Sequence, residues 1–81
     1  MQQLITSPGQ VGEIIRSRRK ARHIVQQTLA AQLHISQSRL SILESDPGNL
    51  TVSRLITLAN VLGFEILIQD KTEVTSPQTE W

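Results

Sequence analysis

The chain has 81 residues, of which 38% are hydrophobic and 19% charged, with a formal net charge of +1 and no cysteine. This length fits one small domain, and no apolar run reaches the roughly 20 residues that cross a bilayer. The N-terminus lacks the charged start and apolar stretch of a secretion signal, and there is no disulfide framework, so a cytoplasmic location without membrane contact is expected.

The charges are unevenly distributed along the chain. Five of the eight cations fall within residues 16–22, and residues 1–69 carry a net charge of +3, whereas residues 70–81 carry −2. A basic body with an acidic tail indicates a polyanionic partner such as nucleic acid. The alternative interpretation is that the basic run is only the solvated face of a helix.

The first predicted helix spans about residues 8–21. Ser7 is a favourable N-cap, Pro8 suits the first helical position, and Gln10 completes a capping box. Towards the end of this predicted helix, arginine side chains continue the row of apolar residues and extend into solvent.

Two short helices joined by a tight turn are predicted next, at about residues 26–32 and from after Ser36 to about Glu44. Apolar residues stand where these helices must touch the rest of the domain: Leu29, Ala30, Leu33, Ile35, Leu40 and Leu43. The second helix has a polar, hydroxyl-rich first turn. This is the pattern of a helix-turn-helix, whose second helix enters the major groove of DNA.

A loop signal at residues 46–49 precedes the last predicted helix. Thr51 can cap this helix and Gly63 can end it. Its buried stripe is expected at Val52, Leu55, Leu58, Ala59 and Leu62.

Residues 64–68 are short, apolar and β-prone, and they are the chain's one strand candidate. A lone strand leaves backbone groups unpaired on both edges, so the same segment of a second copy is its simplest partner. The predicted homodimer interface consists of Phe64, Ile66, Leu67 and Ile68. The alternative is an extended segment packed on its own helices.

Residues 70–81 are polar and aperiodic and are expected to form a disordered acidic tail behind a DNA-binding and dimerisation domain at 1–69.

The segment from about Val11 to Leu62 resembles the XRE-type (Cro/C1-type) helix-turn-helix proteins. The residues that carry the resemblance most specifically are Leu29-Ala30, Ile35-Ser36-Gln37-Ser38, Leu40-Ser41 and Glu44. The resemblance implies a mainly α domain of four to five helices that binds DNA as a dimer and usually represses transcription.

The single strand, the loop at residues 44–51 and the final Glu80-Trp81 narrow the resemblance to HipB-type antitoxins. This implies strand pairing across the dimer, repression of the protein's own operon, and restraint of a HipA-like Ser/Thr kinase toxin, made of one chain or split into two. Trp81 would be an anchor for the partner, since Trp is enriched at binding hot spots; alternatively it is a chance terminus. The rival hypotheses are a free-standing repressor and a protein-interaction module with a vestigial helix-turn-helix.

The family pattern assigns base contacts to the first turn of the recognition helix, at Ser36, Gln37, Ser38, Arg39 and Ser41. Gln37 can bind adenine through two hydrogen bonds, and Arg39 can bind guanine or a phosphate. The serines can reach phosphates or base edges. The alternatives are helix capping or solvation for each serine and an ion pair with a carboxylate for Arg39.

Phosphate contacts are expected at Gln26, where the backbone N–H groups at the start of a helix favour an anion. Arg18, Arg19 and Arg22 are expected to supplement them, with an inverted-repeat operator as the double-stranded target.

Two positions depart from the family pattern. Val25 stands where a capping Thr is usual, which puts the start of the following helix in doubt. His34 stands where a Gly with positive φ is usual, at an expected cost of roughly 1 kcal/mol.

Enzyme chemistry is not indicated. His23 and His34 are the chain's two histidines and have no metal-binding spacing. We find no glycine-rich nucleotide loop and no serine beside a base. With 2% aromatic residues, a stacking surface for single strands is also absent. No cofactor is therefore expected.

Overall fold

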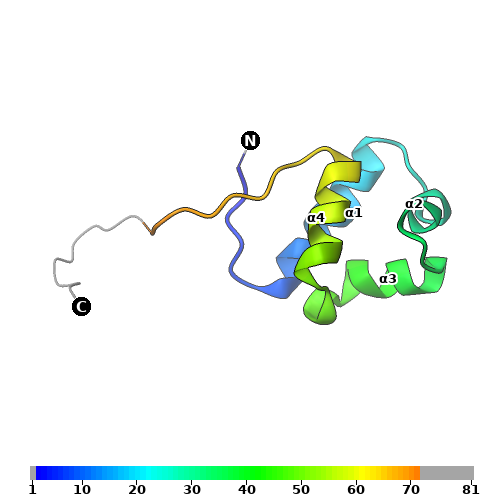
Figure 1. Ribbon diagram of the computed structural model, residues 1–81, viewed down its shortest axis with the longest axis horizontal. Coiled ribbons are helices and arrows are strands. Elements are labelled where there is room, and N and C mark those ends of the chain that lie inside the picture. Colours follow the sequence, from blue (N-terminus) through cyan, green and yellow to red (C-terminus); the bar gives the residue numbers. More distant parts are fainter. Residues whose placement is uncertain (1, 72–81) are drawn as a thin grey trace, which may run out of the picture.

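The computed structural model describes residues 2–71, which form four α-helices and one turn of 3₁₀-helix (Figure 1). The elements are α1 (Pro8–Ala21), α2 (Gln26–Leu33), α3 (Gln37–Ser45), η1 (Pro47–Asn49) and α4 (Val52–Leu62). The four predicted helices are confirmed, and each bound agrees with the prediction to within about one residue.

Side-chain caps explain where three of the helices begin. At α1, the Oε1 atom of Gln10 accepts a hydrogen bond from the backbone N–H of Ser7 at 2.9 Å. At α3 and α4, the hydroxyls of Ser36 and Thr51 each accept from the backbone N–H three residues later, both at 3.1 Å. These bonds satisfy N–H groups that the first turn of a helix otherwise leaves unpaired. Helix α2 begins at Gln26 although Val25 supplies no side-chain cap.

Left-handed residues explain where helices end. Gly63 ends α4 with a φ of 79°, and His34 ends α2 with a φ of 60° and a ψ of 41°, as predicted. His23, in the link between α1 and α2, has a φ of 57°, which the sequence did not indicate.

All four helices contribute to one apolar core. Its fully enclosed members are Ile15, Leu29, Ala30, Leu33, Leu40, Leu58 and Leu62. Burial of a large aliphatic side chain contributes about 1.5–3 kcal/mol, so this cluster holds the helices together. Gly12 lets α1 approach α3 closely, because a Cβ atom there would meet the backbone oxygen of Glu44.

The buried face of α4 is narrower than predicted. Leu58, Ala59 and Leu62 are buried and Leu55 is half-buried, but Val52 is 72% exposed. Val52 lies four residues before Ile56, which is 50% exposed, and the two share an outer side of the helix.

The predicted strand is not present within residues 2–71. Residues 64–71 carry no regular secondary structure, and Figure 1 shows them leaving the end of α4 and running away from the helices. A strand needs a hydrogen-bonded neighbour, and one chain supplies none here. Phe64 packs against the core, whereas Leu67 and Ile68 are 69% and 98% exposed. The alternative prediction, that the segment packs on its own helices, therefore holds for Phe64 at the start of the segment. It does not hold for Leu67 and Ile68 at the end of the segment.

No helix among residues 2–71 has the length and apolar character needed to cross a membrane. The tail predicted for residues 70–81 lies outside the described residues from position 72 onward.

Candidate DNA-binding interface

A tight turn sets α3 against α2. The backbone N–H of Ile35 donates to the carbonyl of Ala30 at 3.0 Å, and that of His34 donates to Ala31 at 3.2 Å. The left-handed His34 permits both bonds, and α3 starts three residues later. In Figure 1, α2 and α3 lie together at one end of the molecule, with α3 across the axis of α2. This is the arrangement of a helix-turn-helix.

Helix α3 has one buried side and one exposed side. Leu40, Leu43 and Glu44 are buried. The outer face of α3, as we call it below, consists of the exposed Gln37, Ser38, Ser41, Ile42 and Ser45. This face carries three of the predicted base-contacting residues. The hydroxyl of Ser36 is occupied as the cap of α3, so for this serine the structure favours the capping alternative.

Ile42 is a member of the outer face that the sequence analysis missed. Its side chain is 60% exposed, and it follows Ser38 by one helical turn. An apolar side chain on a recognition helix can contact the methyl group of thymine. The four-residue spacing from Ser38 is the signal that could have identified it.

A buried hydrogen-bond network ties α1, α2 and α3 together below this face. The Nε and Nη2 atoms of Arg19 donate to the Oε2 and Oε1 atoms of Glu44 at 2.7 and 3.1 Å, and Nη1 donates to the carbonyl of Ile24 at 3.0 Å. The side-chain amide of Gln26 donates to the same Oε1 atom at 3.0 Å. Gln26, the first residue of α2, is thereby fixed relative to α3.

The position of Arg19 requires a correction to the predicted phosphate contacts. Arg19 follows Ile15 by one turn on the buried side of α1, and it is only 8% exposed. Its guanidinium donates to Glu44 and Ile24, so its burial argues against a contact with DNA. The sequence could not show this, because Glu44 lies 25 residues further along the chain.

The structure does not bring Arg18 and Arg22 beside α3. Arg18 is half-buried in the last turn of α1. The guanidinium of Arg22 lies against Gly63, at the C-terminal end of α4. Figure 1 shows the C-terminal ends of α1 and α4 together on the opposite side of the molecule from α3.

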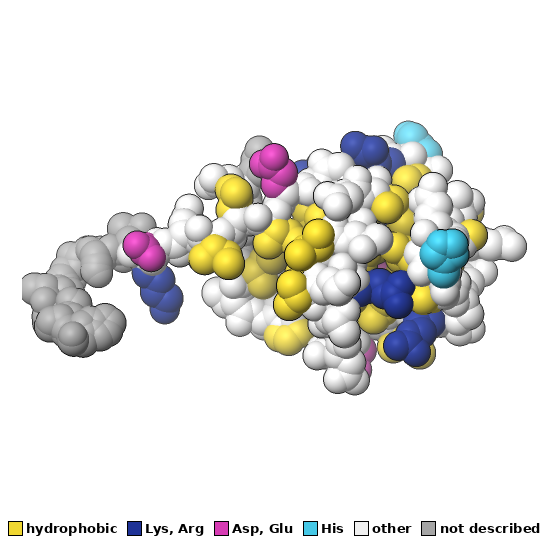
Figure 2. Space-filling view, viewed as in Figure 1, with side chains coloured by type: hydrophobic (Ala, Val, Ile, Leu, Met, Phe, Trp, Pro, Cys, Tyr) yellow, Lys and Arg dark blue, Asp and Glu magenta, His cyan; other side chains and the backbone are white. Residues whose placement is uncertain are grey.

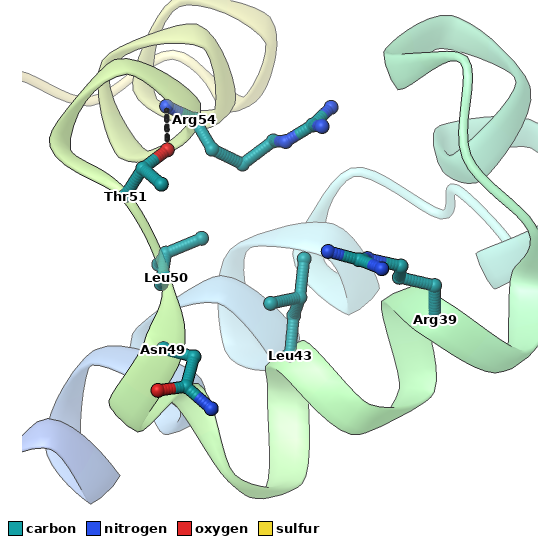
Figure 3. Close-up of a pocket in the computed structure, with 6 residues that line it drawn as sticks. All are labelled: Arg39, Leu43, Asn49, Leu50, Thr51 and Arg54. Atoms are coloured by element: carbon teal, nitrogen blue, oxygen red, sulfur yellow. Dashed lines mark hydrogen bonds between the residues drawn. The ribbon is translucent and has the colours of Figure 1, made fainter.

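Arg39 points along the flank of α3 instead of outward. Its side chain reaches over Leu43 towards α4, into a cleft of about 60 Å³ (Figure 3). The cleft is lined by Arg39, Leu43, Asn49, Leu50, Thr51 and Arg54. No carboxylate among residues 2–71 forms an ion pair with Arg39, so the predicted alternative of an ion pair is not seen there. Arg54 is a second cation that the sequence analysis missed.

An apolar groove lies away from α3, between α4 and the segment that follows it. Its apolar lining includes Val52, Leu55, Ile56 and Ala59 from α4, together with Phe64, Ile66, Leu67 and Ile68. Figure 2 shows hydrophobic side chains gathered on this part of the surface, over α4 and the start of the following segment. The four residues predicted to form the dimer interface therefore do share one surface. Trp81, predicted to bind a partner, lies outside the described residues.

The turn between α2 and α3 and the polar outer face of α3 define the class of protein: a helix-turn-helix DNA-binding domain. Residues 15–68 match the Helix-turn-helix family. The chain therefore belongs to the XRE-type helix-turn-helix family, as the sequence resemblance predicted.

This chain is similar to a repressor protein in sequence and to solved HipB complexes in structure. The immunity repressor protein of Bacillus phage phi105 is 32% identical over an alignment of 73 residues, and the match covers 88% of this chain. The chain spans about half, 51%, of the length of that repressor. Among solved structures, a chain of a HipA-HipB-O2-O3 complex is 25% identical with a TM-score of 0.76, covering 88% of this chain and 100% of that one. A chain of a HipB-O1-O2 complex is 26% identical with a TM-score of 0.74, covering 85% and 100%. The four-helix fold is thus similar to that of HipB.

Proposed function

We propose that the chain is a sequence-specific repressor that binds double-stranded DNA with α3 in the major groove. The observation that carries this proposal is the outer face of α3. It presents one amide and two unengaged hydroxyls, from Gln37, Ser38 and Ser41, with the methyl groups of Ile42 among them. The hydroxyl of Ser45 donates to the carbonyl of Ser41 at 3.0 Å, so it can only accept from a base edge. Amides bind adenine, hydroxyls accept or donate at base edges, and an aliphatic group contacts thymine, so this face matches the chemistry of the major groove. No catalytic step is part of this role.

The start of α2 would bind a backbone phosphate next to the reading helix. The first N–H groups of α2 have no partner within the helix, and Gln26 is held in place by Glu44 at 3.0 Å. A helix N-terminus positioned in this way favours an anion, and phosphate contacts of this kind fix the register of the protein on the duplex. A DNA ligand also fits the cytoplasmic location expected from the sequence.

The functional unit would be a homodimer on an inverted repeat. A single short recognition helix reads few base pairs, whereas a dimer places two such helices on half-sites about 34–36 Å apart. The apolar groove beside α4 supports a second copy as its occupant, because Val52, Ile56 and the segment at 64–68 expose side chains that one chain leaves uncovered. Pairing of residues 64–68 across the dimer would give the unpaired backbone of that segment its hydrogen bonds.

The finer proposal is that this repressor is an antitoxin that controls its own operon and neutralises a HipA-like Ser/Thr kinase, made of one chain or two. Support comes from the similarity to HipB chains, which this chain covers over their whole resolved length and which were solved in complexes with HipA and with O1, O2 and O3. In this role Trp81 would be the anchor for the kinase. The alternative is a free-standing repressor, favoured by the similarity to the phage immunity repressor.

Selection from a random library of duplexes tests the DNA-binding proposal. The chain should enrich an inverted repeat with two half-sites one helical turn apart. The double variant Gln37→Ala/Ser38→Ala should lose the enrichment while keeping its melting temperature, because both side chains are exposed. Ser17→Ala, an exposed change on α1, is the matched control and should select the same duplex. If the parent chain enriches no sequence, the proposal is wrong.

Co-purification from the cells of origin separates the antitoxin from the free-standing repressor. A kinase-like chain in the complex, identified by mass, supports the antitoxin. Recovery of the chain with DNA alone supports the repressor.

A further inference from the structure

Two arginines from different helices line the cleft between α3 and the start of α4. Arg39 comes from the first turn of α3 and Arg54 from the first turn of α4. Figure 3 shows the side chain of Arg39 beside Leu43 and that of Arg54 extending above Leu50, with the open cleft between the two guanidinium groups. The sequence separates the two residues by 15 positions, so this pairing is a product of the fold.

Arg54 is held rigidly where it stands. Its Nη1 atom donates to the carbonyl of Leu33, at the end of α2, at 2.9 Å. Its backbone N–H donates to the hydroxyl of Thr51 at 3.1 Å. The remaining guanidinium donors have no hydrogen bond within residues 2–71, so they are available to a ligand.

The cleft carries positive charge without a counter-charge from the described residues. The ion pairs among residues 2–71 join Glu44 to Arg16 and Arg19, and none of these three residues lines the cleft. Two like charges that point into one space repel each other, and an anion between them removes that repulsion. The planar fork of a guanidinium matches the oxygen atoms of a phosphate. The side chain of Asn49 lines the same cleft and offers a neutral donor.

The cleft opens next to the outer face of α3. Arg39 follows Ser38 directly and precedes Ile42 by one turn, so it stands at the border between the outer face and the buried side. When the outer face lies in the major groove, the border of α3 lies against the sugar-phosphate backbone that edges the groove. We propose that Arg39 and Arg54 together bind one backbone phosphate of the DNA there. This inference rests on the proposed function. Of the two targets predicted for Arg39 from the sequence, guanine or a phosphate, it selects the phosphate and adds Arg54 as a second ligand.

The salt dependence of DNA affinity tests the proposal. On the inverted-repeat duplex selected by the parent chain, the slope of log K against log salt should fall by about two in the dimer of Arg39→Gln/Arg54→Gln, because one phosphate in each half-site loses its neutralising partners. Each single variant should lower the slope by less, because the remaining guanidinium still serves the same phosphate. Lys71→Gln removes one exposed positive charge far from α3 and should keep the parent slope. An unchanged slope in the double variant, or a fall of about four, which would mean two separate phosphates in each half-site, overturns the shared site. A merely structural Arg54 would lower the melting temperature without changing the slope.

Replacing single phosphates by neutral methylphosphonate identifies the ligand. One such position per half-site should weaken binding by the parent chain and leave the double variant unaffected. If no position distinguishes the parent from the double variant, the ligand is not a DNA phosphate and the proposal is wrong. A parent chain that binds no duplex would reject the proposed function itself. If the parent chain binds the duplex and the arginine variants bind it with the same affinity and salt dependence, only the phosphate site is rejected.

Discussion

Glu44 should contribute more to stability than any other charged residue described, and Glu44→Ala tests this. The change removes two charge-assisted hydrogen bonds from Arg19, at 2.7 and 3.1 Å, and one from Gln26, at 3.0 Å. Arg19, which is only 8% exposed in the parent chain, would keep only its bond to the carbonyl of Ile24. Leaving one partner of a buried pair uncompensated costs about 3–5 kcal/mol. Because each kcal/mol moves the melting temperature of such a small domain by about 4–8 °C, we expect a fall of at least about 12 °C.

Urea unfolding followed by circular dichroism measures this loss, with each free energy extrapolated linearly to zero denaturant. The protein concentration is kept fixed, since association would add to the apparent stability. Glu13→Ala, at an exposed position of α1, is the matched control and should change the free energy of unfolding by less than about 0.5 kcal/mol. The double variant Arg19→Met/Glu44→Leu should be more stable than Glu44→Ala, because it leaves no buried charge unpaired. A loss below about 1 kcal/mol in Glu44→Ala would refute the reasoning.

Three further predictions concern the turn, the helix crossing and the dimer. His34→Gly should raise the free energy of unfolding or leave it unchanged, since a φ of 60° strains histidine; a thermal melt that shows a loss above about 1 kcal/mol would contradict this. Gly12→Ala should cost at least about 1–3 kcal/mol in urea unfolding, because the new Cβ atom meets the backbone oxygen of Glu44. Gly9→Ala, where a Cβ atom has no neighbour within 4 Å, is its control and should be neutral or slightly stabilising. Ile66→Lys should split the proposed dimer in analytical ultracentrifugation by placing an ammonium in the apolar groove; a dimer that persists in this variant would move the interface elsewhere.

The helices could be predicted because their signals are local. Ser36 and Thr51 cap α3 and α4 through bonds to the third residue of the same helix, and Gly63 ends α4 by its own backbone conformation. Signals of this kind span four residues or fewer, so the sequence displays them directly. The left-handed turn at His34 was predicted from the same type of information, combined with the family resemblance.

The parts that could not be predicted depend on contacts between distant residues. Arg19 lies in a run of cations, which predicts a solvent-exposed side chain. The fold instead brings its guanidinium to Glu44 and buries it. Arg54 joins Arg39 only because α4 starts beside α3. Val52 fits the apolar period of α4, yet no described element covers it. The segment at 64–68 has the composition of a strand, and whether it forms one depends on a second chain.

Titration of the isotope-labelled chain with its selected duplex, followed by backbone amide chemical shifts, tests most directly whether α3 reads DNA sequence. We expect the shift changes to concentrate at the start of α2 and at residues 36–42, and a scrambled duplex of equal length to give smaller changes at the same positions. Changes confined to α4 and residues 64–68, or equal changes with both duplexes, would contradict the claim that α3 reads DNA sequence.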